Sequence, residues 1–272
     1  VQSAAMALDE ETLATVRRQR MDRIPLWLGV VLLATAMPAI AAGKLETLAD
    51  VFARVQYAVY TRDSTALRAT REDLAGLVDD DDAAPLVHFQ FAYVEFRLAQ
   101  LALQEEEEAA SGHLDGCIEH AVEALERDAM LAEAHALIAV CQGLQGDLSP
   151  LKAVLSSRSA ASHLRKAREL GPKNPRVELL AAIDRYHRPP DGDPQVAVAG
   201  LERALYLFEQ EEPPRNGWPD WGRAEAHAYL GTLYLANDDI MRARNELEQA
   251  LLIAPEYAWA RELVSSVQTP LE

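Results

Sequence analysis

The stretch from Ala224 to Pro255, AEAHAYLGTLYLANDDIMRARNELEQALLIAP, decides the fold of this chain. Apolar residues recur in it at spacings of three and four, which is the pattern of two helices that each have one apolar stripe. The polar run 237–239 predicts a tight turn whose aspartates can cap the second helix, and Pro255 ends that helix. Gly231 and Ala243 are small, as needed where two antiparallel helices approach closely. The stretch therefore predicts a helix–turn–helix hairpin.

This hairpin resembles the tetratricopeptide repeat, a helix–turn–helix unit of about 34 residues. The residues that carry the resemblance are Leu230, Gly231, Tyr234, Ala243, Leu247, Ala250 and Pro255. His227 stands where the pattern usually has Trp, and Leu247 where it usually has Phe. The resemblance extends roughly from Leu131 to Val264, about half of the chain, and it is to tetratricopeptide proteins of the bacterial cell envelope. It implies a right-handed α–α superhelix with a binding groove, and it implies no catalytic activity.

Internal repetition supports an all-α array. The pentapeptide AEAHA occurs at 132–136 and again at 224–228. Matching second-helix positions recur at Ala160, Leu164 and Ala167, at Ala197, Leu201 and Ala204, and at Cys117, Ala121 and Ala124. Residues 257–264 predict a final helix that caps the exposed end, as such arrays require. We therefore expect degenerate repeat-like helix pairs over 42–130 and a tetratricopeptide array with a C-terminal capping helix over 131–272.

Extra residues interrupt the repeat period near 105–112, 144–157 and 189–193. Repeat proteins usually carry such insertions as loops on one face. We therefore expect three loops at these places.

The N-terminus predicts export. A short basic start at residues 21–23 precedes an apolar run from Ile24 to Ala36 and the A-x-A site Ala39-Ile40-Ala41, which together resemble a secretory signal peptide. Residues 1–20 would then be an upstream extension. The alternative is an uncleaved anchor over 24–42, weakened by its two prolines. The expected location is the periplasm, or the inner membrane if the anchor remains.

The charge balance argues against nucleic acid as a partner. The chain has 26 basic and 43 acidic residues, and removing 1–41 takes away four of each, so the remainder keeps a net charge of −17. No basic footprint for nucleic acid remains, and anionic lipid would repel most of the chain. Electrostatics favour a basic peptide or protein partner instead, with membrane contact only through an uncleaved anchor.

The two cysteines and their neighbours leave three interpretations open. Cys117 and Cys141 are expected to face inward on neighbouring repeats, as small buried residues, although export would permit a disulfide between them. His113, Cys117 and His120 share one helical face at i, i+4 and i+7, which could begin a zinc site. Incidental His spacing is common, so we expect no metal and no cofactor.

The binding groove can be placed from helix geometry. In tetratricopeptide superhelices the first helix of each pair lines the concave face, and aromatic residues and Arg are the usual anchors of an interface. The groove candidates at exposed first-helix positions are Glu133, Leu137, Arg176, Leu180, Tyr186, His187, Glu225, Tyr229 and Thr232. The alternative for the aliphatic members is packing between neighbouring first helices.

Enzyme signatures are missing: the chain has no G-x-S-x-G, H-E-x-x-H, P-loop or dinucleotide glycine motif. We therefore expect a non-catalytic scaffold of the bacterial cell envelope that binds a protein or peptide in its groove. The alternatives are a membrane-anchored accessory subunit of an envelope enzyme or transport complex, and a zinc-binding protein.

Overall fold

The computed structural model describes residues 39–77, 84–103, 107–188, 193–212 and 221–268. The chain divides into two compact units, 1–39 and 40–272, and the second contains nearly all of the described residues. The expected signal peptide lies almost entirely outside the described residues. None of the described helices is long and apolar enough to cross a membrane.

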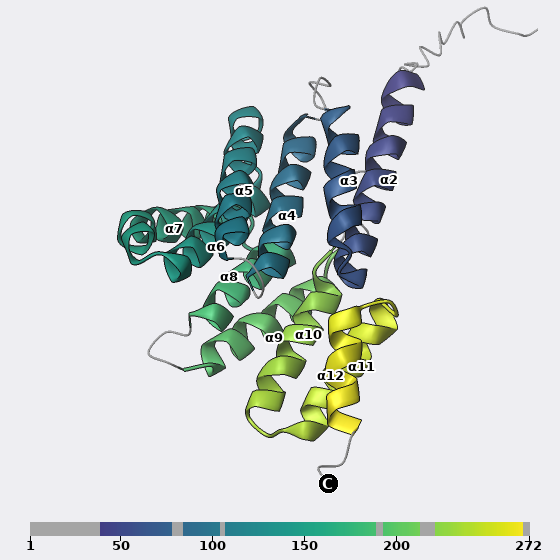
Figure 1. Ribbon diagram of the computed structural model, residues 1–272, viewed down its shortest axis with the longest axis vertical. Helices are drawn as coiled ribbons and strands as arrows, with labels where there is room; N and C mark the ends of the chain where they lie inside the picture. The colour runs from purple at the N-terminus through teal and green to yellow at the C-terminus, as the bar shows by residue number, and fades with distance from the viewer. Residues whose placement is uncertain (1–38, 78–83, 104–106, 189–192, 213–220, 269–272) are drawn as a thin grey trace, which may run out of the picture. The chain divides into compact units, whose positions relative to one another are not determined.

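The described residues fold as an all-α solenoid (Figure 1), which confirms the fold class. They form the helices α2 (Ala39–Thr61), α3 (Ser64–Ala75), α4 (Ala84–Ala102), α5 (Glu107–Arg127), α6 (Ala132–Leu148), α7 (Pro150–Leu170), α8 (Pro175–His187), α9 (Gln195–Glu209), α10 (Arg223–Ala236), α11 (Ile240–Ile253) and α12 (Ala258–Gln268).

Consecutive helices pack as pairs. The most extensive contacts join α4 to α5, α6 to α7, α8 to α9 and α10 to α11, and their short connections make the partners antiparallel. First helices of neighbouring pairs also touch, α4 with α6, α6 with α8, and α10 with α12. The expected pairs and the expected C-terminal helix are therefore present.

The hairpin of α10 and α11 shows how the sequence makes a pair. The Asp239 carboxylate caps α11 by accepting a hydrogen bond from the backbone N–H of Arg242 at 3.1 Å. Gly231 and Leu247 are buried where the helices cross. A Cβ added at Gly231 would lie 2.6 Å from Cγ of Leu247 and 3.3 Å from the carbonyl oxygen of Ala243. The close approach expected from the sequence is therefore real.

Replacing Gly231 with alanine is expected to lower the free energy of unfolding by about 1–3 kcal/mol, because overpacking of the helix crossing outweighs the better helix propensity of alanine. Gly112 provides a matched control, since a Cβ there has no atom within 4 Å in the described structure. Its replacement by alanine should instead stabilise the chain by about 0.5–1 kcal/mol. Urea unfolding of both variants measures the difference, and two changes of the same sign would contradict it.

The expected loop at 144–157 is wrong, and so is the one at 105–112 over its described residues, 107–112. Helix α6 continues to Leu148 and α7 begins at Pro150, so the extra residues lengthen two helices around a single turn residue. Gly146 permits this sharp turn, because a Cβ there would be 3.2 Å from the Cβ of Ala153. Residues 107–112 are likewise the first turns of α5. Residues 189–192 of the third expected loop lie outside the described residues.

The first pair of helices contacts the last. Gln56 Nε2 of α2 donates a hydrogen bond to Glu225 of α10 at 3.1 Å, and the Tyr60 hydroxyl does so at 3.3 Å. The Tyr60 ring packs 4.9 Å from that of Tyr257. Arg62, after α2, pairs with Glu262 of α12 at 3.1 Å. These contacts bring the two ends of the described array together around one pocket.

Candidate functional site

A pocket of about 590 Å³ lies among the first helices. Its lining comes from α2, α3, α4, α6, α8, α10 and α12 and the turns beside them. The lining residues are Val59, Arg62, Leu67, Arg97, Gln100, Leu101, Leu103, Leu144, Asp147, Tyr186, His187, Tyr229, Thr232, Tyr257, Trp259, Glu262 and Leu263.

Helical periodicity explains why these side chains converge. On α4 the lining residues are 97, 100 and 101, on α10 they are 229 and 232, and on α12 they are 259, 262 and 263. Residues three and four apart lie on one helix face, so each helix presents one short stripe to the pocket. Helices α4, α6 and α8 contribute their C-terminal halves, and α12 contributes its N-terminal half.

Aromatic rings form one wall of the pocket. The Tyr229 ring lies edge-on between Tyr186 and Trp259, with centroid distances of 5.0 Å to each. Tyr257 continues the row, 6.1 Å from Trp259. Burial raises the pKa of the Tyr229 hydroxyl to about 12 and also raises that of Tyr186. Both hydroxyls therefore keep their protons at neutral pH and can donate hydrogen bonds.

A buried ion pair supports the pocket from below. Nη2 of Arg97 lies 2.6 Å from Oε1 of Glu225, and both side chains are almost completely buried. Arg97 also donates to the Tyr93 hydroxyl and to Oε1 of Gln100, at 2.8 Å each. Glu225 accepts further bonds from the backbone N–H of Gly222 at 3.0 Å and from α2. This network links α2, α4 and α10 beneath the aromatic side chains of the pocket.

Four of the groove candidates from the sequence line this pocket: Tyr186, His187, Tyr229 and Thr232. The other five are buried in the helix packing. Leu137 and Leu180 are completely buried, because neighbouring first helices pack side by side there. The three charged residues are Glu133, which accepts from Asn174 at 2.7 Å, Arg176, which pairs with Glu211, and Glu225. Their positions make them structural residues and correct the groove assignment.

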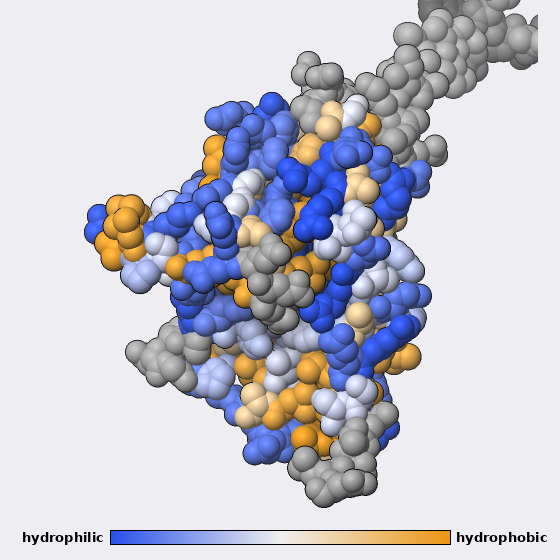
Figure 2. All heavy atoms as spheres, in the orientation of Figure 1, coloured by the Kyte–Doolittle hydropathy of each residue, from blue (hydrophilic) through white to orange (hydrophobic). Residues whose placement is uncertain are grey.

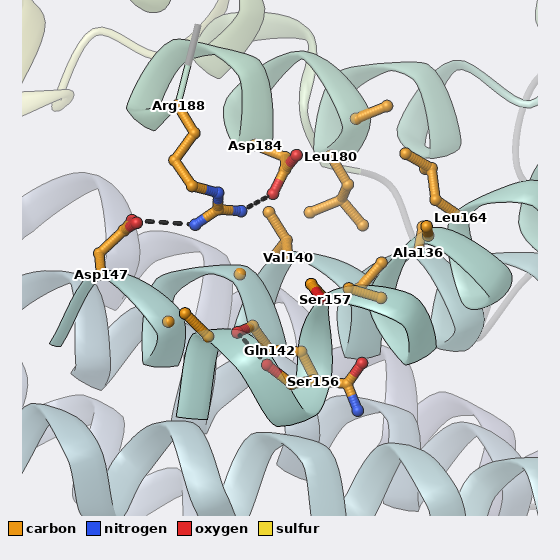
Figure 3. Close-up of a pocket in the computed structure, with 17 residues that line it drawn as sticks. Ala136, Val140, Gln142, Asp147, Ser156, Ser157, Leu164, Leu180, Asp184 and Arg188 are labelled. Atoms are coloured by element: carbon orange, nitrogen blue, oxygen red, sulfur yellow. Dashed lines mark hydrogen bonds and ion pairs between the residues drawn. The ribbon is translucent and has the colours of Figure 1, made fainter. Parts of the chain in front are cut away.

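A smaller pocket of about 330 Å³ lies between α6, α7 and α8 (Figure 3). Its walls are mostly small or aliphatic, including Ala136, Val140 and Leu180. The Arg188 guanidinium spans one side of it, between Asp147 at 2.9 Å and Asp184. Because its charged groups already pair with each other, this pocket is a less suitable binding site than the aromatic pocket.

Cys117 and Cys141 form a disulfide, with their Cα atoms 6.7 Å apart. The expectation of two unbonded small residues is therefore wrong, although both sulfur-bearing side chains are buried as expected. The disulfide also removes Cys117 from the alternative zinc set with His113 and His120. His113 instead lies with Nδ1 at 2.6 Å from the buried carboxylate of Glu95.

Sequence reasoning missed the pocket residues on α4 and α12. Arg97 and Glu95 interrupt a long apolar helix. Because a charge in such a helix requires a buried partner, these two residues were the feature of the sequence that indicated a polar network on α4. Trp259 was expected only to cap the array, and Glu262 was not singled out. Trp259 contacts Tyr229 of α10, and Glu262 pairs with Arg62 in the turn after α2. No local pattern in the sequence indicates these contacts.

Helix α7 exposes an apolar face. Leu151, Val154 and Leu155 are each at least 70% exposed, and Figure 2 shows hydrophobic atoms where α7 lies. Charged and polar side chains cover much of the remaining visible face. A cluster of exposed apolar residues of this kind is typical of interaction surfaces.

No protein-family model matches the chain, and no curated protein matches it. A solved structure described as the assembly chaperone of RpL4 (Acl4, residues 1–338) is similar to it at 18% sequence identity. That similarity covers 84% of this chain and 91% of the other, with a TM-score of 0.37.

Proposed function

We propose that the chain is a non-catalytic, tetratricopeptide-type scaffold of the bacterial cell envelope that binds a peptide segment of a partner protein in the aromatic pocket. The observation that carries this proposal is the row Tyr186, Tyr229 and Trp259, which lies in a pocket bounded by several first helices. Large rings on a rigid scaffold are the usual anchors of recognition.

The pocket suits an extended peptide with an apolar or aromatic side chain. A volume of about 590 Å³ is within the usual range of ligand sites. The hydroxyls of Tyr186 and Tyr229 line the pocket and can donate to peptide carbonyls. The net charge of −17 favours the approach of a basic partner over that of an acidic one.

Two features support the repeat type and the location. The consensus positions Leu230, Gly231 and Leu247 are buried at the crossing of α10 and α11, where the tetratricopeptide pattern needs them. The disulfide of Cys117 and Cys141 supports export, because disulfides persist in oxidising compartments such as the periplasm.

Selection of a displayed random peptide library against the full chain tests the binding function. The selected peptides are then measured by fluorescence anisotropy against variants. Trp259→Ala removes a partly exposed ring of the wall and should weaken binding by about tenfold or more, as loss of an aromatic anchor usually does. Thr232→Trp should also weaken binding, because it fills the pocket.

Tyr206 provides the matched control. It is an exposed aromatic residue on α9, 58% accessible and outside the pocket, so Tyr206→Ala should change the affinity less than twofold, as peripheral contacts usually do. Equal binding by wild type, Trp259→Ala and Thr232→Trp would show that the pocket is not the site.

N-terminal sequencing of the mature protein tests the proposed location. A start at Ala42 supports a cleaved signal peptide and a periplasmic scaffold. An intact apolar run recovered in the membrane fraction would instead support the anchored accessory subunit.

A further inference from the structure

A second cluster of functional side chains lies away from the aromatic pocket, between α4 and α5. It contains His88 of α4 and His120 and Glu123 of α5, whose potential ligand atoms all lie within 4.8 Å of one another. His120 and Glu123 are three residues apart and therefore share one helix face. This face points at α4, as the ring distance of 6.1 Å between His88 and His120 shows.

We propose that His88, His120 and Glu123 form a binding site for a divalent transition-metal ion, with zinc as the favoured ion. Two imidazoles and one carboxylate are the ligand set of several zinc sites that keep an open position for water. Soft and borderline metals prefer imidazole nitrogen, whereas magnesium and calcium prefer oxygen ligands.

Unsatisfied nitrogen atoms support the site independently. His88 is buried, and among the described residues neither of its ring nitrogens has a hydrogen-bond partner. Its Nδ1 lies 2.6 Å from Oε2 of Glu123, so the two atoms are close without the angle of a hydrogen bond. A buried imidazole whose nitrogens make no hydrogen bond is unfavourable, and a shared metal ion would satisfy them.

The distances from Glu123 to the two imidazoles require only a small adjustment. Ligand atoms on a tetrahedral zinc ion, at about 2.0–2.1 Å from it, lie about 3.3–3.4 Å apart. Nδ1 of His120 is already 3.5 Å from Oε2 of Glu123. Nδ1 of His88 is closer to Oε2 of Glu123, at 2.6 Å. Glu123 is partly exposed, so its carboxylate can rotate to lengthen this distance.

The surroundings hold the imidazole of His120 in place. The Phe91 ring stacks on His120 with centroids 4.7 Å apart. Cys117, one turn before His120, is fixed to α6 by the disulfide. Supports of this kind around ligands are typical of metal sites.

Arg127 is the group that opposes a cation here. Burial first, and then the charge of Arg127, lower the pKa of His88. Replacing Arg127 with glutamine should therefore tighten metal binding a few-fold.

Calorimetric titration with zinc chloride at pH 7.5 tests the site, using the full chain without a histidine tag after dialysis against EDTA. We expect one zinc ion per chain, and an affinity that falls at least about tenfold in His120→Gln and in Glu123→Gln. Both residues are partly exposed, so these variants should fold, and far-UV circular dichroism verifies it. Zinc should raise the Tm of the wild type and not that of the double variant.

The chain offers two matched controls. His113→Gln changes another histidine of α5, and His135→Gln with His163→Gln removes a pair whose Nδ1 atoms are 2.9 Å apart. Both controls should bind zinc like the wild type. Undiminished binding by the His120→Gln, Glu123→Gln double variant, or loss of binding in either control, would overturn the proposal.

Discussion

Replacing Glu225 with alanine is expected to lower the free energy of unfolding by about 3–5 kcal/mol, the range for removal of one partner of a buried ion pair. The change leaves the charge of Arg97 buried without its carboxylate. It also removes the acceptor for Gln56, Tyr60 and the N–H of Gly222. Urea unfolding monitored by circular dichroism measures the effect.

The exposed pair of Arg62 and Glu262 is the natural control. It joins the same ends of the described array at 3.1 Å, but the Glu262 side chain is 63% accessible. Because solvent screens such pairs, Glu262→Ala should cost less than about 1 kcal/mol. A loss of similar size in both variants would mean that burial of the Arg97–Glu225 pair is not what makes it important.

Reduction of the disulfide is expected to destabilise the chain by about 3.5 kcal/mol. The bond closes a loop with a sequence separation of 24 residues, and the chain-entropy model gives roughly this value for such a loop. Urea unfolding with and without dithiothreitol measures it. The slope of the transition should also steepen on reduction, because the unfolded chain exposes more surface without the cross-link.

The double variant Cys117→Ala, Cys141→Ala separates the cross-link from the packing. Both cysteines occupy positions where the repeat pattern has small residues, and both are completely buried, so alanine fits. Its stability should match that of the reduced wild type and should not respond to dithiothreitol. A wild-type midpoint that is also unaffected by reductant would contradict the stabilising role of the bond.

The helix pairs could be predicted from the sequence because each pair is determined locally. Small residues such as Gly231, the cap at Asp239 and the stop at Pro255 act within about 34 residues of each other. The length of each pair is less local. Residues 144–157 depart from the repeat period, and only the structure shows that they extend α6 and α7 instead of forming a loop.

The pocket could be predicted only in part, for a physical reason. Tyr186 and Tyr229 lie at first-helix positions that the helical spacing picks out, so periodicity is enough to find them. Arg97 reaches the same pocket only because α4 lies beside α10, which is distant in sequence. Arg176 and Glu225 have the same helical spacing as the pocket-lining Tyr186 and Tyr229, yet both are buried in ion pairs.

The contacts between α2 and the C-terminal helices have a consequence for how the chain unfolds. In an open repeat array each unit depends only on its neighbours, so the ends can fray one at a time. Here Tyr60 and Gln56 depend on Glu225 and Tyr257 across more than 160 positions of sequence. Unfolding of α12 would therefore also remove contacts that stabilise α2. The terminal repeats should then unfold cooperatively and not one at a time.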